Sequence, residues 1–177
     1  MFKMYLENTI DIKKIEINNL KYDDQLDDQT SVIFDICRCF QKTNSVNFVI
    51  EGFGSKRWPV DCEYDLPSVI EEIPEIIEKF NNREYNHTLG FYEQGVMREL
   101  IFKEAGDGEL MLECKSLIEG WSPSPSHILV GKLSVMQILE EMYRVFISLG
   151  KIVCPELLRE RIFIDWINKY NISYILN

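Results

Sequence analysis

Residues 87–116 read HTLGFYEQGVMRELIFKEAGDGELMLECKS, and this stretch predicts three short strands joined by two turns, a β-meander. The first turn is Glu93-Gln94-Gly95, and the second covers residues 105–108, with the sequence AGDG. Glycine supplies the positive φ that tight reversals need, and Asp-Gly is a strong hairpin signal. The third strand alternates apolar and polar residues, as antiparallel strands with one buried face do. We expect the rest of the chain to pack on this sheet or to extend it.

The composition indicates one acidic globular domain, residues 1–177. The chain has 29 acidic and 19 basic side chains, for a net charge of -10. This balance argues against a nucleic-acid partner and against anionic membranes, and it favours a basic protein partner. The start of the chain has no signal-peptide pattern, and no apolar run is long enough for a membrane span. The five cysteines have unrelated spacings, so we expect reduced thiols and a cytoplasmic location.

The N-terminal third is expected to be mostly extended. Isoleucines alternate with polar residues in residues 1–20, which predicts an extended segment or two short strands. Residues 21–30 predict an acidic loop. Residues 31–40, SVIFDICRCF, are rich in β-branched and aromatic side chains and predict a strand, paired as a hairpin with residues 47–53.

Three helices are expected after these strands. Ser68 and Glu71 form a capping-box pattern before an apolar stripe that ends at Phe80, with Pro74 as a kink or a later start. A second helix follows Ser134 and places Gly150 at its C-terminal cap, and a third begins at Pro155. Ile128-Leu129-Val130 predicts one more strand. The order indicates an α+β fold, with a mostly antiparallel sheet (hairpin plus β-meander) and amphipathic helices on one face.

The search for chemistry yields weak candidates. Asp61, Glu63 and Asp65 alternate, so an extended chain places them on one side, as a cation or acid–base site or as an exposed acidic edge. Cys37 and Cys39 would share a face of a strand, but no second ligand pair follows for zinc. A pairing of Cys62 or Cys114 with His87 or His127 has no supporting motif. We therefore expect no enzyme activity, no cofactor and no metal, and we interpret the cysteines as buried apolar residues.

A resemblance to a known family rests on a pattern within residues 47–166. Its elements are Trp58-Pro59, Leu66-Pro67, Ile70, Ile73-Pro74, Phe91-Tyr92-Glu93-Gln94-Gly95 and Arg98. In these features the chain resembles the immunity proteins encoded beside bacterial polymorphic toxins of the contact-dependent-inhibition kind. The resemblance implies an acidic, cytoplasmic α+β protein that neutralises one cognate toxin, often a nuclease, by binding it. It carries over no binding residue, because contact residues differ between such families.

The acidic composition and the resemblance lead to one functional expectation. We expect a stoichiometric inhibitor that occludes a cognate, basic toxin, with no nucleic-acid or membrane partner, as a monomer or a homodimer. The expected contact residues are the acidic side chains of two loops: Asp23, Asp24, Asp27, Asp28, Asp61, Glu63 and Asp65. The outer sheet face, with Met97, Glu99, Met111 and Glu113, is a reserve candidate. One alternative is a small-molecule site or an uncharacterised active site between the sheet and the helices. Another is a structural subunit that dimerises through the outer sheet face.

Overall fold

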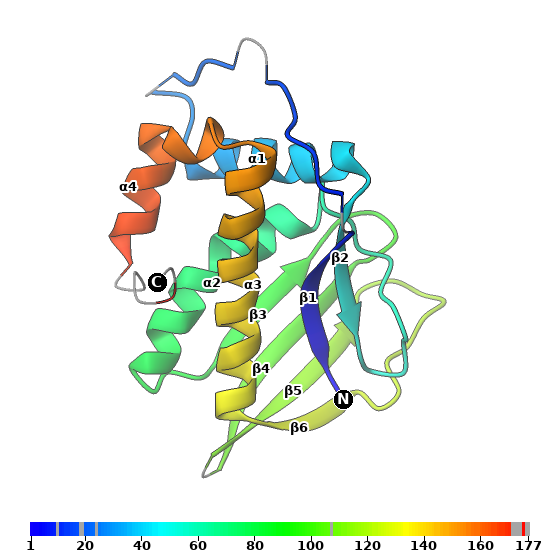
Figure 1. The fold of residues 1–177 in the computed structure, drawn as a ribbon. Helices are drawn as coiled ribbons and strands as arrows, with labels where there is room; N and C mark the ends of the chain where they lie inside the picture. Colours follow the sequence, from blue (N-terminus) through cyan, green and yellow to red (C-terminus); the bar gives the residue numbers. More distant parts are fainter. Residues whose placement is uncertain (10, 18–19, 24, 107, 171–174, 176–177) are drawn as a thin grey trace.

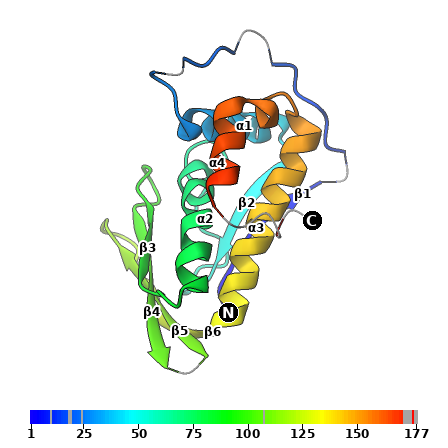
Figure 2. The same cartoon turned by 90° about the vertical axis from the view of Figure 1, so that its left-hand side faces the viewer.

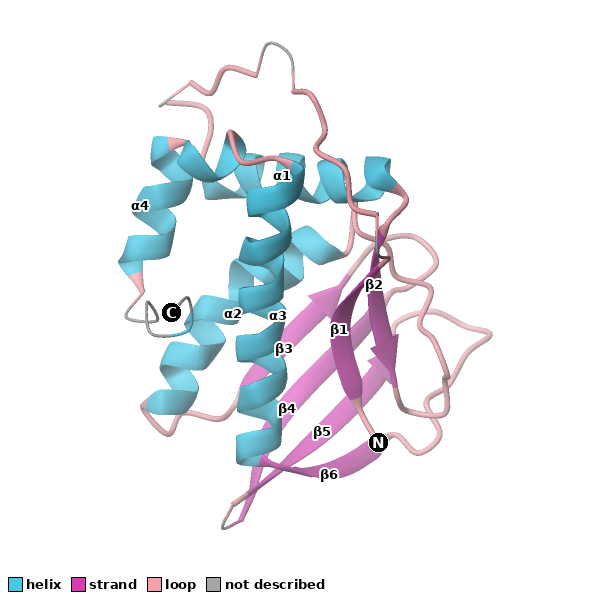
Figure 3. Ribbon diagram, in the orientation of Figure 1, coloured by secondary structure: helices cyan, strands magenta, loops and turns pink. Residues whose placement is uncertain are grey.

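The computed structural model describes residues 1–177 except 10, 18–19, 24, 107, 171–174 and 176–177 (Figure 1). Helices and strands are distributed as an α+β fold, as the sequence predicts (Figure 3). In chain order the elements are β1 (Lys3–Asn8), α1 (Gln29–Thr43), β2 (Val46–Glu51), α2 (Leu66–Asn81), β3 (His87–Phe91), β4 (Arg98–Gly106), β5 (Glu109–Ser116), β6 (His127–Gly131), α3 (Lys132–Val153), the 3₁₀ turn η1 (Leu157–Arg159) and α4 (Arg161–Lys169).

The predicted β-meander is confirmed as β3, β4 and β5, and the predicted strand β6 extends it. The four strands form one antiparallel sheet in the order β3-β4-β5-β6. Leu100 lies opposite Cys114 and Phe102 lies opposite Leu112, and all four side chains are buried on the inner face. Figure 2 shows this sheet along one side of the molecule, with the helices on the other side. The sheet therefore has one face in the core and one face open.

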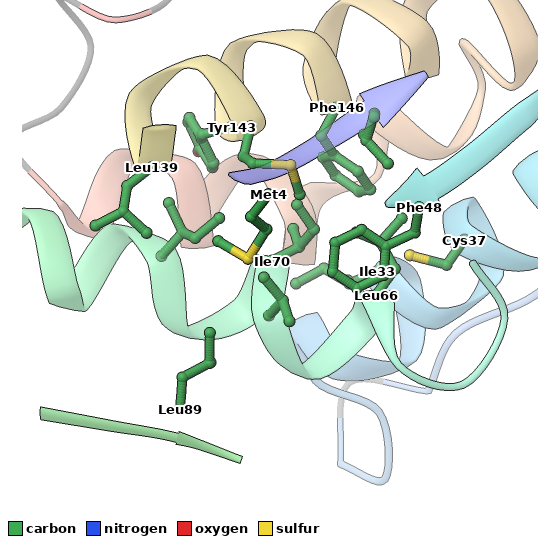
Figure 4. Packing of buried hydrophobic residues seen from close by; sticks show 14 of the residues in the cluster. Met4, Ile33, Cys37, Phe48, Leu66, Ile70, Leu89, Leu139, Tyr143 and Phe146 are labelled. Atoms are coloured by element: carbon green, nitrogen blue, oxygen red, sulfur yellow. The ribbon is translucent and has the colours of Figure 1, made fainter. Parts of the chain in front are cut away.

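The two strongest amphipathic patterns form the helices that were predicted from them. The apolar stripe of α2 is buried along its whole length, and so are the main apolar positions of α3, among them Leu139 and Phe146. Figure 4 shows side chains from β1, α1, β2, α2, β3 and α3 meeting in one core. Within the described part of the chain, no helix combines the length and the apolar character needed to cross a membrane.

The predicted hairpin of residues 31–53 is wrong in its first half. Residues 31–40 belong to the helix α1, and β2 pairs instead with β1, with Met4 opposite Ile50. Val32, Ile33, Ile36, Cys37 and Phe40 form a buried stripe at helical spacing, which the β-branched residues obscured, and Cys39 is also buried. Burial of this stripe outweighs the modest helix propensity of valine and isoleucine.

The predicted helix caps also differ from the structure. α2 begins at Leu66 and continues through Pro74, so Ser68 lies inside its first turn. The Ser68 hydroxyl donates to the Asp65 carbonyl oxygen (3.0 Å), and Glu71 accepts from Thr30 on α1 (2.6 Å) instead of capping its own helix. Gly150 lies within α3, where a Cβ would be 2.7 Å from a methyl group of Leu158. That glycine therefore permits close packing rather than ending the helix.

The segment that follows β1 contacts the end of α3. Beyond β1, the Ile15 N–H donates to the Val153 carbonyl oxygen at the end of α3 (2.8 Å), and Ile10 lies outside the described residues. After Pro155 the chain forms η1 before α4 begins, so the third helix starts later than predicted. The C-terminal segment predicted to pack back or to form an edge strand lies outside the described residues, apart from the buried Ile175.

Candidate functional site

The first predicted acidic group forms the turn that leads into α1. Asp27 accepts a hydrogen bond from the Asp23 N–H (2.8 Å), and Asp28 caps α1 by accepting from the Thr30 N–H (2.9 Å). Asp24 lies outside the described residues. These carboxylates organise the turn with one oxygen each, and the side chains of Asp23 and Asp28 remain exposed.

The second predicted acidic group forms the turn before α2, and its three members have different environments. Asp61 accepts from the Tyr64 N–H (2.7 Å), and Glu63 lies 3.6 Å from Nε of Arg38. Asp65 is only 3% exposed and accepts from the Asp61 N–H (3.0 Å). The structure therefore does not place the three carboxylates along one exposed edge. Asp65 faces the interior and cannot meet a partner in this conformation.

Helix α1 joins the two acidic groups into one surface. Arg38 pairs with Glu63 and also with Asp35 (3.5 Å), and the rings of Phe34 and Tyr64 have centroids 6.4 Å apart. We call this surface the α1 face. It consists of the accessible carboxylates beside α1 and the rings between them: Tyr22, Asp23, Asp27, Asp28, Phe34, Asp35, Glu63 and Tyr64. The sequence analysis did not predict Phe34 and Asp35 as surface residues of a helix, because residues 31–40 were interpreted as a strand, and it did not predict the contacts of Tyr22 and Tyr64 with them.

A hollow of about 480 Å³ opens in the α1 face. It is lined by residues of the acidic loop and the first half of α1: Leu20, Lys21, Tyr22, Asp27, Thr30, Ser31, Phe34 and Asp35. The Tyr22 hydroxyl donates to Oδ2 of Asp35 (2.8 Å), and burial raises the pKa of Tyr22 well above its ordinary value. Two carboxylates beside two aromatic rings can hold a guanidinium or ammonium group by ion pairing and stacking.

The buried Asp65 carboxyl makes stability depend on pH. Burial raises its pKa to about 6, above the ordinary range for aspartate. The folded state therefore holds this proton more tightly than the unfolded state. The contribution of Asp65 to the free energy of unfolding therefore falls as the pH rises from about 4 to 6, and it is recovered as the pH falls again.

Asp65→Asn should remove this pH dependence. The wild type should gain on the order of 1 kcal/mol relative to Asp65→Asn when the pH is lowered from about 7 to 5. Denaturant unfolding of both proteins at the two pH values measures the difference, and it cancels the titration of all other groups. Equal changes in the two proteins would show that Asp65 has an ordinary pKa.

A larger groove lies on another side of the molecule, between β1, β6 and the first half of α3. Its volume is about 1120 Å³. The lining consists of residues 1–5 around β1, residues 128–131 of β6, and six residues of α3: Ser134, Gln137, Ile138, Glu140, Glu141 and Arg144. Figures 1 and 2 both show the N-terminal end of β1 close to β6, with α3 following directly from β6. No sequence pattern indicated this groove, because its three walls come from distant segments.

A buried arginine lies between two tryptophans under the loop that follows β5. The guanidinium carbon of Arg98 is 3.5 Å from the ring centroid of Trp121 and 4.6 Å from that of Trp58. Arg98 is 5% exposed, and burial lowers its pKa from the ordinary value. Phe91 packs edge-on against Trp58, with centroids 5.4 Å apart. Three residues of the family resemblance, Trp58, Phe91 and Arg98, thus belong to one packing cluster, so they account for architecture rather than for a binding site.

The outer sheet face is polar and partly paired. Glu113 contacts Lys103 on β4 and Lys115 on its own strand, which lowers the pKa of the Glu113 carboxyl. Met97 has φ +42° and lies before β4, so it is not part of the alternating row that was predicted. Glu99 and Met111 are half-buried on strands β4 and β5. None of these residues lines the hollow beside α1.

The predicted metal ligands Cys37 and Cys39 do not converge, and both histidines contact other side chains. Cys37 and Cys39 lie on a helix, where a separation of two residues directs side chains about 200° apart. His87 pairs with Glu72 (2.8 Å) and His127 with Ser126 (2.7 Å). All five cysteines are buried free thiols. Among the described residues, no group of three or more histidine, cysteine or carboxylate side chains is placed to hold a metal ion.

Comparisons with known proteins add no relationship to this geometry. A scan against protein-family models, a search of curated proteins and a search of solved structures each gave no match.

Proposed function

We propose that this protein is an immunity protein that binds a cognate basic toxin in the cytoplasm and neutralises it by occlusion. The observation that carries the proposal is the hollow of the α1 face, where Asp27 and Asp35 lie beside the rings of Tyr22 and Phe34. An arginine or lysine of the toxin would enter this hollow. A nuclease is the toxin class that fits best, because a cleft that binds phosphate groups is rich in such side chains.

The charge of the chain supports both the encounter and the specificity of such a complex. A net charge of -10 accelerates association with a basic protein and makes the rate depend on salt. The pairs of Arg38 with Asp35 and Glu63 leave the α1 face net acidic. The aromatic rings add the apolar area that anchors an interface once charge has steered the partners together.

The proposal can be tested by removing charge from the α1 face without removing its hydrogen bonds. Asparagine and glutamine keep an accepting oxygen, so the turn and the α1 cap remain satisfied. The test variant carries four substitutions: Asp23→Asn, Asp27→Asn, Asp28→Asn and Glu63→Gln. Its affinity for the protein encoded immediately upstream should fall roughly tenfold or more, since exposed charge pairs contribute about 0.2–1 kcal/mol each. Titration calorimetry at two salt concentrations measures the affinity and its salt dependence.

A matched control removes four exposed carboxylates away from the α1 face. It carries Glu78→Gln, Glu84→Gln, Glu109→Gln and Glu119→Gln, so its net charge equals that of the test variant. We expect this control to bind nearly as tightly as the wild type and to protect cells that produce the upstream protein. Equal losses of affinity in the two variants would show that only the net charge of the protein matters. Unchanged affinity in the test variant would disprove the role of the α1 face. No binding by the wild type would refute the proposed function.

A further inference from the structure

The groove between β1, β6 and α3 is bordered by the ends of two sheets. In the part of the chain that the structure describes, β1 pairs only with β2, and β6 is the last strand of the four-stranded sheet. Among the described residues, no backbone hydrogen bond joins the free edge of either strand to another segment. An unpaired strand edge presents a row of N–H and C=O groups that can pair with an added strand.

Both strands meet the groove with their edges. Side chains alternate along a strand, so a strand that shows one face to a cavity lines it with every second residue. Here consecutive residues line the groove, 1–5 on one wall and 128–131 on the other. The backbones of both strands are therefore accessible from within it. A compact ligand would use a few convergent polar groups, whereas two accessible backbone edges suit an extended chain.

The inner face of β6 lacks the cover that its neighbours have. Ile128 lies opposite Leu112 and Val130 lies opposite Leu110, so the four side chains share the inner face. Leu110 and Leu112 are fully buried, but Ile128 and Val130 are only half-buried and line the groove. Ile138 of α3 lies in the same lining. An added chain with apolar side chains at alternate positions would cover these residues.

The charge of the whole chain, rather than that of the groove lining, favours a basic segment: the net charge is -10, which also opposes docking of a second copy. The charged side chains that line the groove balance, with Glu140 and Glu141 against Lys3 and Arg144. Arg144 is held by Glu141 and by the Ile175 carbonyl oxygen. On the β1 wall, Lys3 is held by Glu51 (2.9 Å). Both groove cations are therefore engaged within the chain, whose net charge is -10.

We propose that an extended segment of the partner protein, apolar at alternate positions and flanked by lysine or arginine, adds as a strand to the free edge of β6. β1 and α3 form the other two walls of the site. The inference rests on the proposed toxin-binding function and gives that function a second contact, separate from the α1 face.

The experiment places a tryptophan side chain in the groove and, as a control, places one on α3 outside the groove. The affinities of the two variants for the partner are then compared. Ser134 is exposed and lines the groove, whereas Ser148 is exposed on the same helix outside the lining. The probe is the protein encoded immediately upstream. Ser134→Trp should weaken its binding about tenfold or more, while Ser148→Trp should leave the affinity unchanged. In the wild-type complex, the amides of residues 127–131 that face the groove should exchange with solvent more slowly than in the free protein.

The outcomes separate this inference from the proposed function. One outcome would disprove the role of the groove and leave the proposed function intact. In it, the four-substitution variant of the α1 face loses affinity, Ser134→Trp keeps full affinity, and amide exchange in β6 is unchanged on binding. A wild-type dimer that Ser134→Trp converts to a monomer in light scattering would make a second copy the occupant and overturn the proposal. No complex with the wild type would refute the function and this inference together.

Discussion

Trp58→Ala should lower the free energy of unfolding by about 3–5 kcal/mol, the usual cost of removing a large aromatic side chain from a core. Trp58 is 1% exposed and contacts the rings of Phe53, Phe91 and Trp121. Its indole N–H also donates to the Gly52 carbonyl oxygen (3.4 Å). The substitution therefore opens a cavity at the point where β2, β3, β4 and the loop after β5 meet. Denaturant unfolding followed by circular dichroism measures the change.

The same substitution should couple to Arg98. Removing Trp58 leaves the buried guanidinium stacked on Trp121 alone, with Nε and one terminal nitrogen still lacking hydrogen-bond partners among the described residues. A double-mutant cycle of Trp58→Ala and Arg98→Met should give a coupling energy of about 1–2 kcal/mol. Trp58→Phe is the matched control, because it keeps a ring in the cluster and should cost clearly less than alanine. A loss below about 1 kcal/mol in Trp58→Ala would contradict the packing described for this cluster.

Gly54→Ala is expected to have the second-largest effect and should lower the free energy of unfolding by about 2–4 kcal/mol. Gly54 has φ +83°, and a Cβ there would lie 2.5 Å from the Ser124 carbonyl oxygen. The clash involves backbone, so no side-chain rotation relieves it. The Ser124 N–H also donates to the Phe53 carbonyl oxygen (2.9 Å), which holds the two loops together. The added methyl group must separate these loops or distort the turn after β2.

Gly95→Ala separates the cost of the clash from the cost of the backbone angle. Gly95 has φ +93°, similar to that of Gly54, but a Cβ there would meet no atom within 4 Å. Gly95→Ala should therefore lower the free energy of unfolding only by the penalty for a positive φ, about 1–2 kcal/mol. Thermal or denaturant unfolding of both variants gives the comparison. Equal losses would mean that the loops at Gly54 and Ser124 are not in close contact in solution.

The elements with one clear periodicity could be predicted from the sequence. The turns around Gly95 and Gly108 separate strands whose apolar residues alternate, and α2 and α3 have apolar residues at helical spacing. α1 could not be recognised in the same way. Val32, Ile33 and Ile36 favour strands by composition, and Asp28, which caps the helix, was interpreted as part of a solvated acidic loop. The error also assigned β2 to the wrong partner.

The candidate site was predicted only in part. The acidic turns before α1 and α2 were recognised by composition, but their members differ in environment because Asp65 lies inside the fold and Asp23 lies outside. Tyr22, Phe34 and Asp35 were not predicted, since their contact depends on the way the loop folds back on α1. The groove depends on three segments that are far apart in the chain.

By itself, the sequence determined the acidic character of this protein, its α+β class, the β-meander and the two long amphipathic helices. These properties depend on composition and on local patterns, because side-chain alternation and helical spacing act over a few residues. Only the tertiary structure decided the pairing of β1 with β2, the burial of Asp65 and Arg98, the hollow beside α1 and the groove with two free strand edges. Each of these depends on contacts between distant segments, and the burial of apolar surface that drives such contacts has no direction along the chain.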